Sequence, residues 1–122
     1  MEISVKKPTE REGAEIWELV RRSGKLDLNS PYCYMMVCRY FGDTCAIAKQ
    51  GGRTVGFVTG FRPPPQPDTW FVWQIAVDPG VRGSGIARRL MEHVLHRPEN
   101  SDIRFVEATV TPSNALSRAL FL

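Results

Sequence analysis

Long hydrophobic runs are missing from this sequence. No stretch of about 18 apolar residues occurs, which argues against a membrane-spanning helix. The first residues, Met-Glu-Ile-Ser-Val-Lys-Lys, have no apolar segment of the secretory type. The net charge is only +3, and no basic run is interleaved with aromatic residues. These features argue against nucleic acid and membrane as partners. The 122 residues, 43% of them hydrophobic, predict a single domain over residues 1–122.

Cysteine is also scarce. Cys33, Cys38 and Cys45 form no Cys-x-x-Cys pair. An odd count without metal-ligand spacing predicts reduced, mostly buried thiols in a cytoplasmic protein that holds no metal. None of the three has an adjacent histidine or acid, so burial is favoured over a role as nucleophile.

The two common phosphate-binding motifs are absent too, since no Walker Lys-Ser/Thr pair and no complete Gly-x-Gly-x-x-Gly occurs. What the chain does have is an organised stretch from Trp70 to Leu95. An aromatic and β-branched run up to Val77 predicts a strand, and residues 78–80, Asp-Pro-Gly, break it. After Gly85 the apolar residues recur at helical spacing.

The connection between this strand and this helix predicts a pyrophosphate site. Gly83 and Gly85 stand where the helix would begin. A helix start carries unpaired N–H groups and partial positive charge, and glycines let a phosphate approach the backbone. Arg82 would add a charge-assisted hydrogen bond. The alternative is an ordinary glycine-rich turn, which is the default for the glycines alone.

The combination is more specific than its parts. Arg82-x-x-Gly85-x-Ala87, five residues after a strand that runs into Asp-Pro, resembles the acetyl-CoA signature of the GCN5-related N-acetyltransferases (GNAT). Longer stretches resemble one branch of that family, the L-2,4-diaminobutyrate acetyltransferases of ectoine biosynthesis. These stretches are residues 26–34, 56–62, 70–77 and 109–114. The resemblance covers nearly the whole chain.

The resemblance implies an α+β fold with a mixed, mostly antiparallel sheet flanked by helices, whose fourth and fifth strands splay apart. The residues themselves predict strands at 3–6, 44–49, 54–62, 70–77 and 103–110. Helix starts are predicted by a capping box at residues 9–12 and by Ser30-Pro31. The chain stops at Leu122 inside an apolar helix. We therefore expect the domain to be C-terminally incomplete and to lack its last C-terminal strands.

The resemblance also implies acetyl-CoA as co-substrate. Pantetheine would pair with main chain of the central strand, as an added strand would, and the backbone N–H of Ile75 would stabilise the oxyanion. Plain sheet core is the alternative for these residues, and it is compatible because the contact uses main chain. The predicted acetyl-CoA contacts are Ile75, Ala76, Val77, Arg82, Gly83, Ser84, Gly85, Ile86, Ala87 and Asn114.

The implied reaction is direct transfer in a ternary complex. The acetyl group passes to the γ-amine of L-2,4-diaminobutyrate, giving N-γ-acetyl-diaminobutyrate for ectoine, a compatible solute. Two ammonium groups need an acidic pocket, for which we select Asp27, with Tyr32 and Trp73 beside it. The alternatives are that Asp27 bonds its own loop and that Tyr32 is a core or rim residue. The residues do not identify the general base.

Three functions stay open at this point. The first is the diaminobutyrate acetyltransferase, and the second is a GNAT enzyme for another diamine or amino acid. The third is an acetyl-CoA-binding module without turnover. Phe121 bears on the third, because many relatives place there a tyrosine that protonates the departing thiolate. The resemblance also allows a homodimer.

Overall fold

Five strands form one sheet. The computed structural model describes residues 2–81 and 83–108. The strands lie in sequence order, β1 to β4 pair antiparallel, and β5 pairs parallel with β4. The strands are β1 (Ile3–Lys6), β2 (Ala46–Gln50), β3 (Arg53–Phe61), β4 (Thr69–Val77) and β5 (Phe105–Ala108). The predicted mixed, mostly antiparallel sheet is confirmed.

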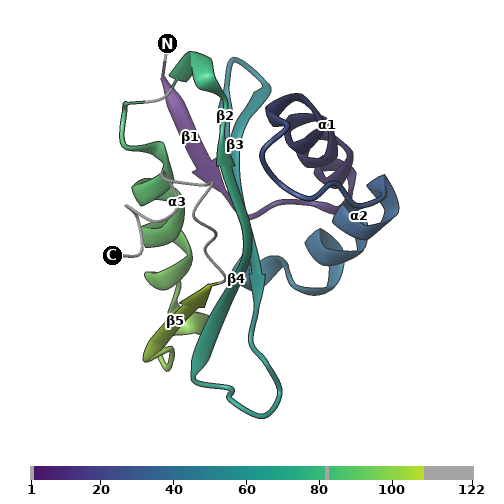
Figure 1. Cartoon of the computed structure of the whole chain (residues 1–122). Coiled ribbons are helices and arrows are strands. Elements are labelled where there is room, and N and C mark those ends of the chain that lie inside the picture. Colours follow the sequence, from purple (N-terminus) through teal and green to yellow (C-terminus); the bar gives the residue numbers. More distant parts are fainter. Residues whose placement is uncertain (1, 82, 109–122) are drawn as a thin grey trace.

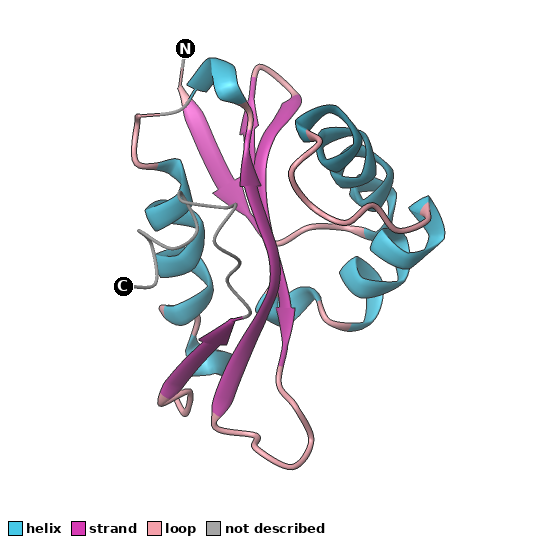
Figure 2. Ribbon diagram, viewed as in Figure 1, coloured by secondary structure: helices cyan, strands magenta, loops and turns pink. Residues whose placement is uncertain are grey.

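Helices cover both faces of this sheet, as Figures 1 and 2 show. Two of them, α1 (Gly13–Ser23) and α2 (Pro31–Tyr40), lie on one face, and α3 (Ile86–Leu95) lies on the other. Short 3-10 turns connect the elements. These are η1 (Glu10–Glu12), η2 (Gly42–Thr44), η3 (Pro79–Val81) and η4 (Pro98–Asn100). Across the described ranges, every helix is too short or too polar to cross a bilayer.

The helix starts follow the local signals in the sequence. The capping box forms at the start of η1, where the Glu12 carboxylate accepts the Thr9 N–H at 2.9 Å. The Ser30 hydroxyl accepts the Cys33 N–H at 3.3 Å, and Pro31 follows as the first residue of α2. Residues 24–30, which include Asp27, form the connection between α1 and α2.

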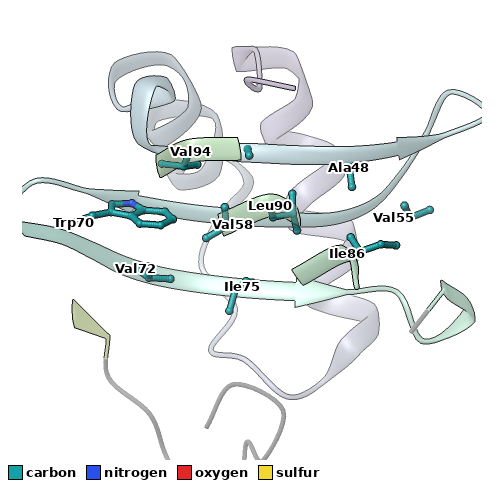
Figure 3. Close-up of a cluster of buried hydrophobic side chains, with 10 residues drawn as sticks. Ala48, Val55, Val58, Trp70, Val72, Ile75, Ile86, Leu90 and Val94 are labelled. Carbon is teal, nitrogen blue, oxygen red and sulfur yellow. The ribbon is translucent and has the colours of Figure 1, made fainter. Parts of the chain in front are cut away.

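Two clusters of buried side chains form the core, one on each face of the sheet. Figure 3 shows the first, in which Ile86, Leu90 and Val94 of α3 pack against the strands. The burial of one such side chain contributes about 1.5–3 kcal/mol. Because Ile86 is the first residue of α3, this cluster fixes the point at which the preceding glycine loop enters the helix.

Four strands have bounds that differ from the predictions. The strand expected at 70–77 is β4, which begins one residue earlier, at Thr69. The strand expected at 44–49 begins at Ala46, because Thr44 belongs to η2 and its hydroxyl donates to the Gly60 carbonyl at 2.7 Å. The strand expected at 54–62 is β3, shifted by one residue at each end. The strand expected at 103–110 is described only as β5, which starts at Phe105, while residues 109 and 110 lie outside the described residues.

Candidate active site

The central strand β4 is irregular at Trp73. Thr59 of β3 pairs with Gln74, whereas the next residue, Gly60, pairs with Val72, so Trp73 is an extra residue in a β-bulge. The bulge changes which face each side chain takes. Val72 and Ile75 both belong to the cluster under α3, while Trp73 packs against the cluster under α1 and α2. Bulges of this kind re-aim side chains next to active sites.

Among the described residues, the second half of β4 has an open edge. β5 pairs only with Thr69–Val72, and Figure 1 shows it beside that part of β4 alone. Within the described residues, no strand lies beside Trp73–Val77 on this edge. An extended ligand can add to such an edge by main-chain hydrogen bonds. The predicted acetyl-CoA contacts Ile75, Ala76 and Val77 all lie on this segment.

The glycine loop before α3 suits an anion. Gly83 and Gly85 have φ of 89° and 73°, and a Cβ at either position would meet no atom within 4 Å. No side chain caps α3, and among bonds between described residues the first from this helix back to the loop runs from the Arg89 N–H to the Gly85 carbonyl at 3.0 Å. No other described residue accepts the amides of residues 86–88. Backbone amides at a helix start, beside glycines that leave room for a ligand, are what a phosphate needs.

The other predicted contacts with acetyl-CoA lie partly among the described residues and partly outside them. Ser84 is exposed, and its hydroxyl donates to the Val81 carbonyl. Ala87 is half-buried in the first turn of α3. Arg82 and Asn114 lie outside the described residues. The loop therefore offers backbone groups for the proposed contact, and the roles of the individual residues stay predictions.

A buried carboxylate that sequence reasoning missed holds the turn between β4 and this loop. Asp78 Oδ1 accepts the Gly80 N–H at 2.9 Å, and Oδ2 accepts from Arg22 Nη1 at 3.2 Å and Arg53 Nη2 at 3.0 Å. The pKa of Asp78 lies below its usual value, first because of the Gly80 N–H and then because of the two guanidinium groups. The Asp-Pro-Gly sequence predicts a turn, but no local signal predicts that arginines of α1 and β3 pair with Asp78.

We expect Asp78→Ala to loosen the glycine loop. The variant loses one cap and two ion pairs with half-exposed arginines, so the free energy of unfolding should fall by about 1–2 kcal/mol. Coenzyme A binding, measured by calorimetry, should weaken roughly threefold to tenfold. Asp43→Asn, which removes an exposed charge paired with Lys7, is the control and should change neither quantity. Unchanged coenzyme A affinity in Asp78→Ala would show that the glycine loop keeps its binding conformation without Asp78.

The predicted amine-side residues lie around the α1–α2 connection. Asp27 is exposed there, and no other described residue hydrogen-bonds its carboxylate. Tyr32 is 74% exposed on α2. Trp73 is half-buried and stacks on Tyr34, with ring centroids 5.4 Å apart and planes at 24°. Asp27, Tyr32 and Trp73 share no side-chain hydrogen bond, ion pair or ring contact with one another in the described structure, so their shared role stays a prediction.

Two buried polar residues, not predicted, connect this region to β4. Tyr34 Oη donates to Gln74 Oε1 at 2.9 Å, and Gln74 Nε2 donates to the Asp27 carbonyl at 2.7 Å. The Asn29 N–H donates to Tyr34 Oη at 3.4 Å. Tyr34 is 0% and Gln74 6% exposed. The sequence gives one signal for them, since α2 is rich in tyrosines and each buried hydroxyl needs a partner.

Two of the three cysteines are unsuited to act as nucleophiles. Cys38 and Cys45 are buried, and burial raises the pKa of each thiol to about 12, so both stay protonated near neutral pH. Cys33 is half-buried. The predicted burial is confirmed for Cys38 and Cys45. In the part of the chain that the structure describes, no group of three or more His, Cys, Asp or Glu is placed to hold a metal ion.

A bulged central strand followed by a glycine loop at the start of a helix is the arrangement that we expect of an acetyltransferase domain. The profile of the acetyltransferase (GNAT) family matches residues 13–122, and the chain belongs to that family. The chain is 53% identical over 119 residues to an L-2,4-diaminobutyric acid acetyltransferase of Halalkalibacterium halodurans and 51% identical over 115 residues to one of Marinococcus halophilus.

These matches cover 98% and 94% of this chain, but only 62% and 66% of the relatives. The chain thus spans less than two thirds of the length of these two relatives. Among solved structures, it is similar to the diaminobutyrate acetyltransferase EctA from Paenibacillus lautus in complex with L-2,4-diaminobutyric acid and coenzyme A. That match has a TM-score of 0.95 at 48% identity and covers 98% of this chain and 72% of the other.

Proposed function

We propose that this chain carries the activity of an L-2,4-diaminobutyrate acetyltransferase. It transfers the acetyl group of acetyl-CoA to the γ-amine, and the product serves ectoine biosynthesis. One observation carries the proposal: a chain of 48% identity and TM-score 0.95 was solved with diaminobutyric acid and coenzyme A bound. The open edge of β4 and the glycine loop support it independently, because they offer the two main-chain sites that an acyl-CoA needs.

In this proposal the main chain of β4 does most of the catalytic work. Ile75, Ala76 and Val77 hold the pantetheine arm as an added strand, and the Ile75 N–H stabilises the oxyanion. The amides of Gly83 and Gly85 face the diphosphate. A bond forms between the amine nitrogen and the acetyl carbon, and the bond from that carbon to sulfur breaks. No side-chain nucleophile takes part, in agreement with the protonated buried thiols.

The amine must lose a proton before it attacks. A side-chain-like amine has a pKa near ~10, so its neutral form at pH ~7 costs about 4 kcal/mol. The exposed Asp27 carboxylate is our candidate for the contact with an ammonium group, with Tyr32 and Trp73 as further walls of the pocket.

Thiol release with a panel of amines tests the proposal. Coenzyme A release is followed with diaminobutyrate, ornithine, lysine and spermidine, and we expect diaminobutyrate to give at least roughly tenfold higher kcat/KM than the others. Equal or faster release with another amine would favour a GNAT enzyme of different specificity. Coenzyme A binding by calorimetry without release from any amine would favour the non-catalytic module.

We further propose that residues 1–122 form one N-acetyltransferase domain that acts in the cytoplasm on a small-molecule amine, and that a homodimer is its working state. The buried, reduced cysteines support the compartment. Size-exclusion chromatography with light scattering tests the oligomeric state, and a monomer at assay concentration would contradict the dimer.

A further inference from the structure

A buried polar bridge links the strand that carries the candidate oxyanion amide to the loop that carries the candidate ammonium contact. The bridge consists of Gln74 on β4 and Tyr34 on α2. Gln74 immediately precedes Ile75, and its amide donates to the carbonyl of Asp27. The Gln74 side chain therefore holds the loop to β4 through the main-chain carbonyl of Asp27. Asp27 is also the residue that we assign to the substrate.

The bridge forms a directed chain of hydrogen bonds. The Asn29 N–H donates to Tyr34 Oη, Tyr34 Oη donates to Gln74 Oε1, and Gln74 Nε2 donates to the Asp27 carbonyl, at 3.4, 2.9 and 2.7 Å. Both ends of the segment 27–29 are thus held from one side. Within the described residues, no buried side-chain polar atom lacks a partner. In a site from which water is largely excluded, breaking one link leaves its partners unpaired at high cost.

The β-bulge makes this arrangement possible. Without an extra residue, neighbouring side chains of a strand point to opposite faces. Here Trp73 and Gln74 both lie on the α1–α2 face, where Trp73 stacks on the Tyr34 ring and Gln74 bonds the Tyr34 hydroxyl. Tyr34 therefore touches two of our three candidate substrate residues, because its ring stacks on Trp73 and its Oη lies 3.4 Å from the carbonyl oxygen of Asp27.

We propose that Gln74 and Tyr34 are positioning residues. They set the distance between the amine loop at residues 27–29 and the acyl-bearing edge of β4, and thereby the reach of the amine that the enzyme accepts. The proposal rests on the proposed function. Neither side chain takes a proton or touches the acyl group, since both are buried and fully engaged with each other and with the loop.

The test compares two tyrosines of the same helix. Tyr34→Phe keeps the stacked ring and removes only the hydroxyl, and Tyr40→Phe is the matched control because Tyr40 is 67% exposed. We expect Tyr34→Phe to raise KM for diaminobutyrate roughly fivefold to twentyfold. The coenzyme A dissociation constant should stay within about twofold of wild type, because no main-chain group of the open edge is changed. Tyr40→Phe should leave both constants unchanged.

Gln74→Met provides a second variant. Methionine fills a similar volume but removes both hydrogen bonds of the amide. Its effect and that of Tyr34→Phe should be strongly non-additive in the double variant, because both break one bridge. If Gln74→Met does not fold, Tyr34→Phe alone decides the question.

The outcomes separate this inference from the proposed function. A purely structural role would lower the melting temperature and the active fraction, with kcat reduced and KM for the amine unchanged, and would overturn the inference. A loss of coenzyme A affinity as large as the rise in KM would overturn it too. Wild-type protein that releases no thiol with any amine would refute the proposed function itself, and the inference with it.

Discussion

Gly85→Val is expected to raise the dissociation constant for acetyl-CoA at least roughly tenfold. Gly85 has φ of 73° and directly precedes α3. A non-glycine residue in this left-handed region costs about 1–2 kcal/mol, and a β-branched one is a genuine outlier there. Valine would therefore shift the loop out of its present shape and would place its methyl groups in the open space before the amides. Calorimetry with acetyl-CoA measures the effect.

A matched control separates loss of the site from backbone strain. Gly52 at the β2–β3 turn has φ of 79°, and a Cβ there also meets no atom within 4 Å. Gly52→Val should therefore carry a similar strain and a similar loss of stability, with acetyl-CoA affinity unchanged. Equal affinities for wild type and Gly85→Val would contradict the assignment of the glycine loop to the diphosphate.

The order of elements could be predicted because its signals are local. The start of α2 is set by Ser30 and Pro31, and the end of β4 by the Asp-Pro-Gly turn at residues 78–80. Each signal acts within one turn of chain, so it survives in the folded protein. The predicted start of β2 was wrong. Thr44 belongs to a 3-10 turn instead, where its hydroxyl donates to the Gly60 carbonyl of β3, a residue distant in sequence.

In the candidate site, too, features set by local sequence could be predicted and features set by distant residues could not. Main-chain sites such as the open edge and the glycine loop follow from strand, turn and helix, and they were predictable in position. The supports were not, because Asp78 meets Arg22 and Gln74 meets Tyr34 across 56 and 40 residues of chain. The bulge at Trp73 could not be predicted from the pattern of apolar residues either, because it depends on how β4 pairs with β3.

A similar long-range contact governs the response to acid. The Glu12 carboxylate accepts the Thr9 N–H at 2.9 Å and pairs with Lys6 Nζ at 2.9 Å and Lys49 Nζ at 3.0 Å. Burial by itself would raise the pKa of Glu12, but these groups outweigh it and lower the pKa to about 2, from an ordinary 4.5. The carboxylate thus joins β1, β2 and the start of α1 as a charged group.

The sign of the pH dependence follows from that shift. Because the folded state holds the pKa of Glu12 below its unfolded value, the stabilisation is complete above about pH 5 and is lost as pH falls toward 2. A shift of this size corresponds to about 3 kcal/mol, which the half-exposed Lys6 reduces to about 2 kcal/mol. We expect Glu12→Gln to lose that amount of unfolding free energy at pH 7, and much less at pH 3, where the wild-type carboxylate has lost most of its advantage.

Urea unfolding at pH 7, 5, 4 and 3 measures this convergence of the two proteins. Glu10→Gln is the matched control, since Glu10 lies two residues away and pairs with Arg39 on the surface. Its unfolding curves should follow those of wild type at every pH. A constant difference between Glu12→Gln and wild type across the pH range would show that packing, not charge, accounts for the contribution of Glu12. In that case the acid sensitivity of the fold would come from other carboxylates. Asp78 is the best placed of these, because Gly80 and two arginines hold its pKa low.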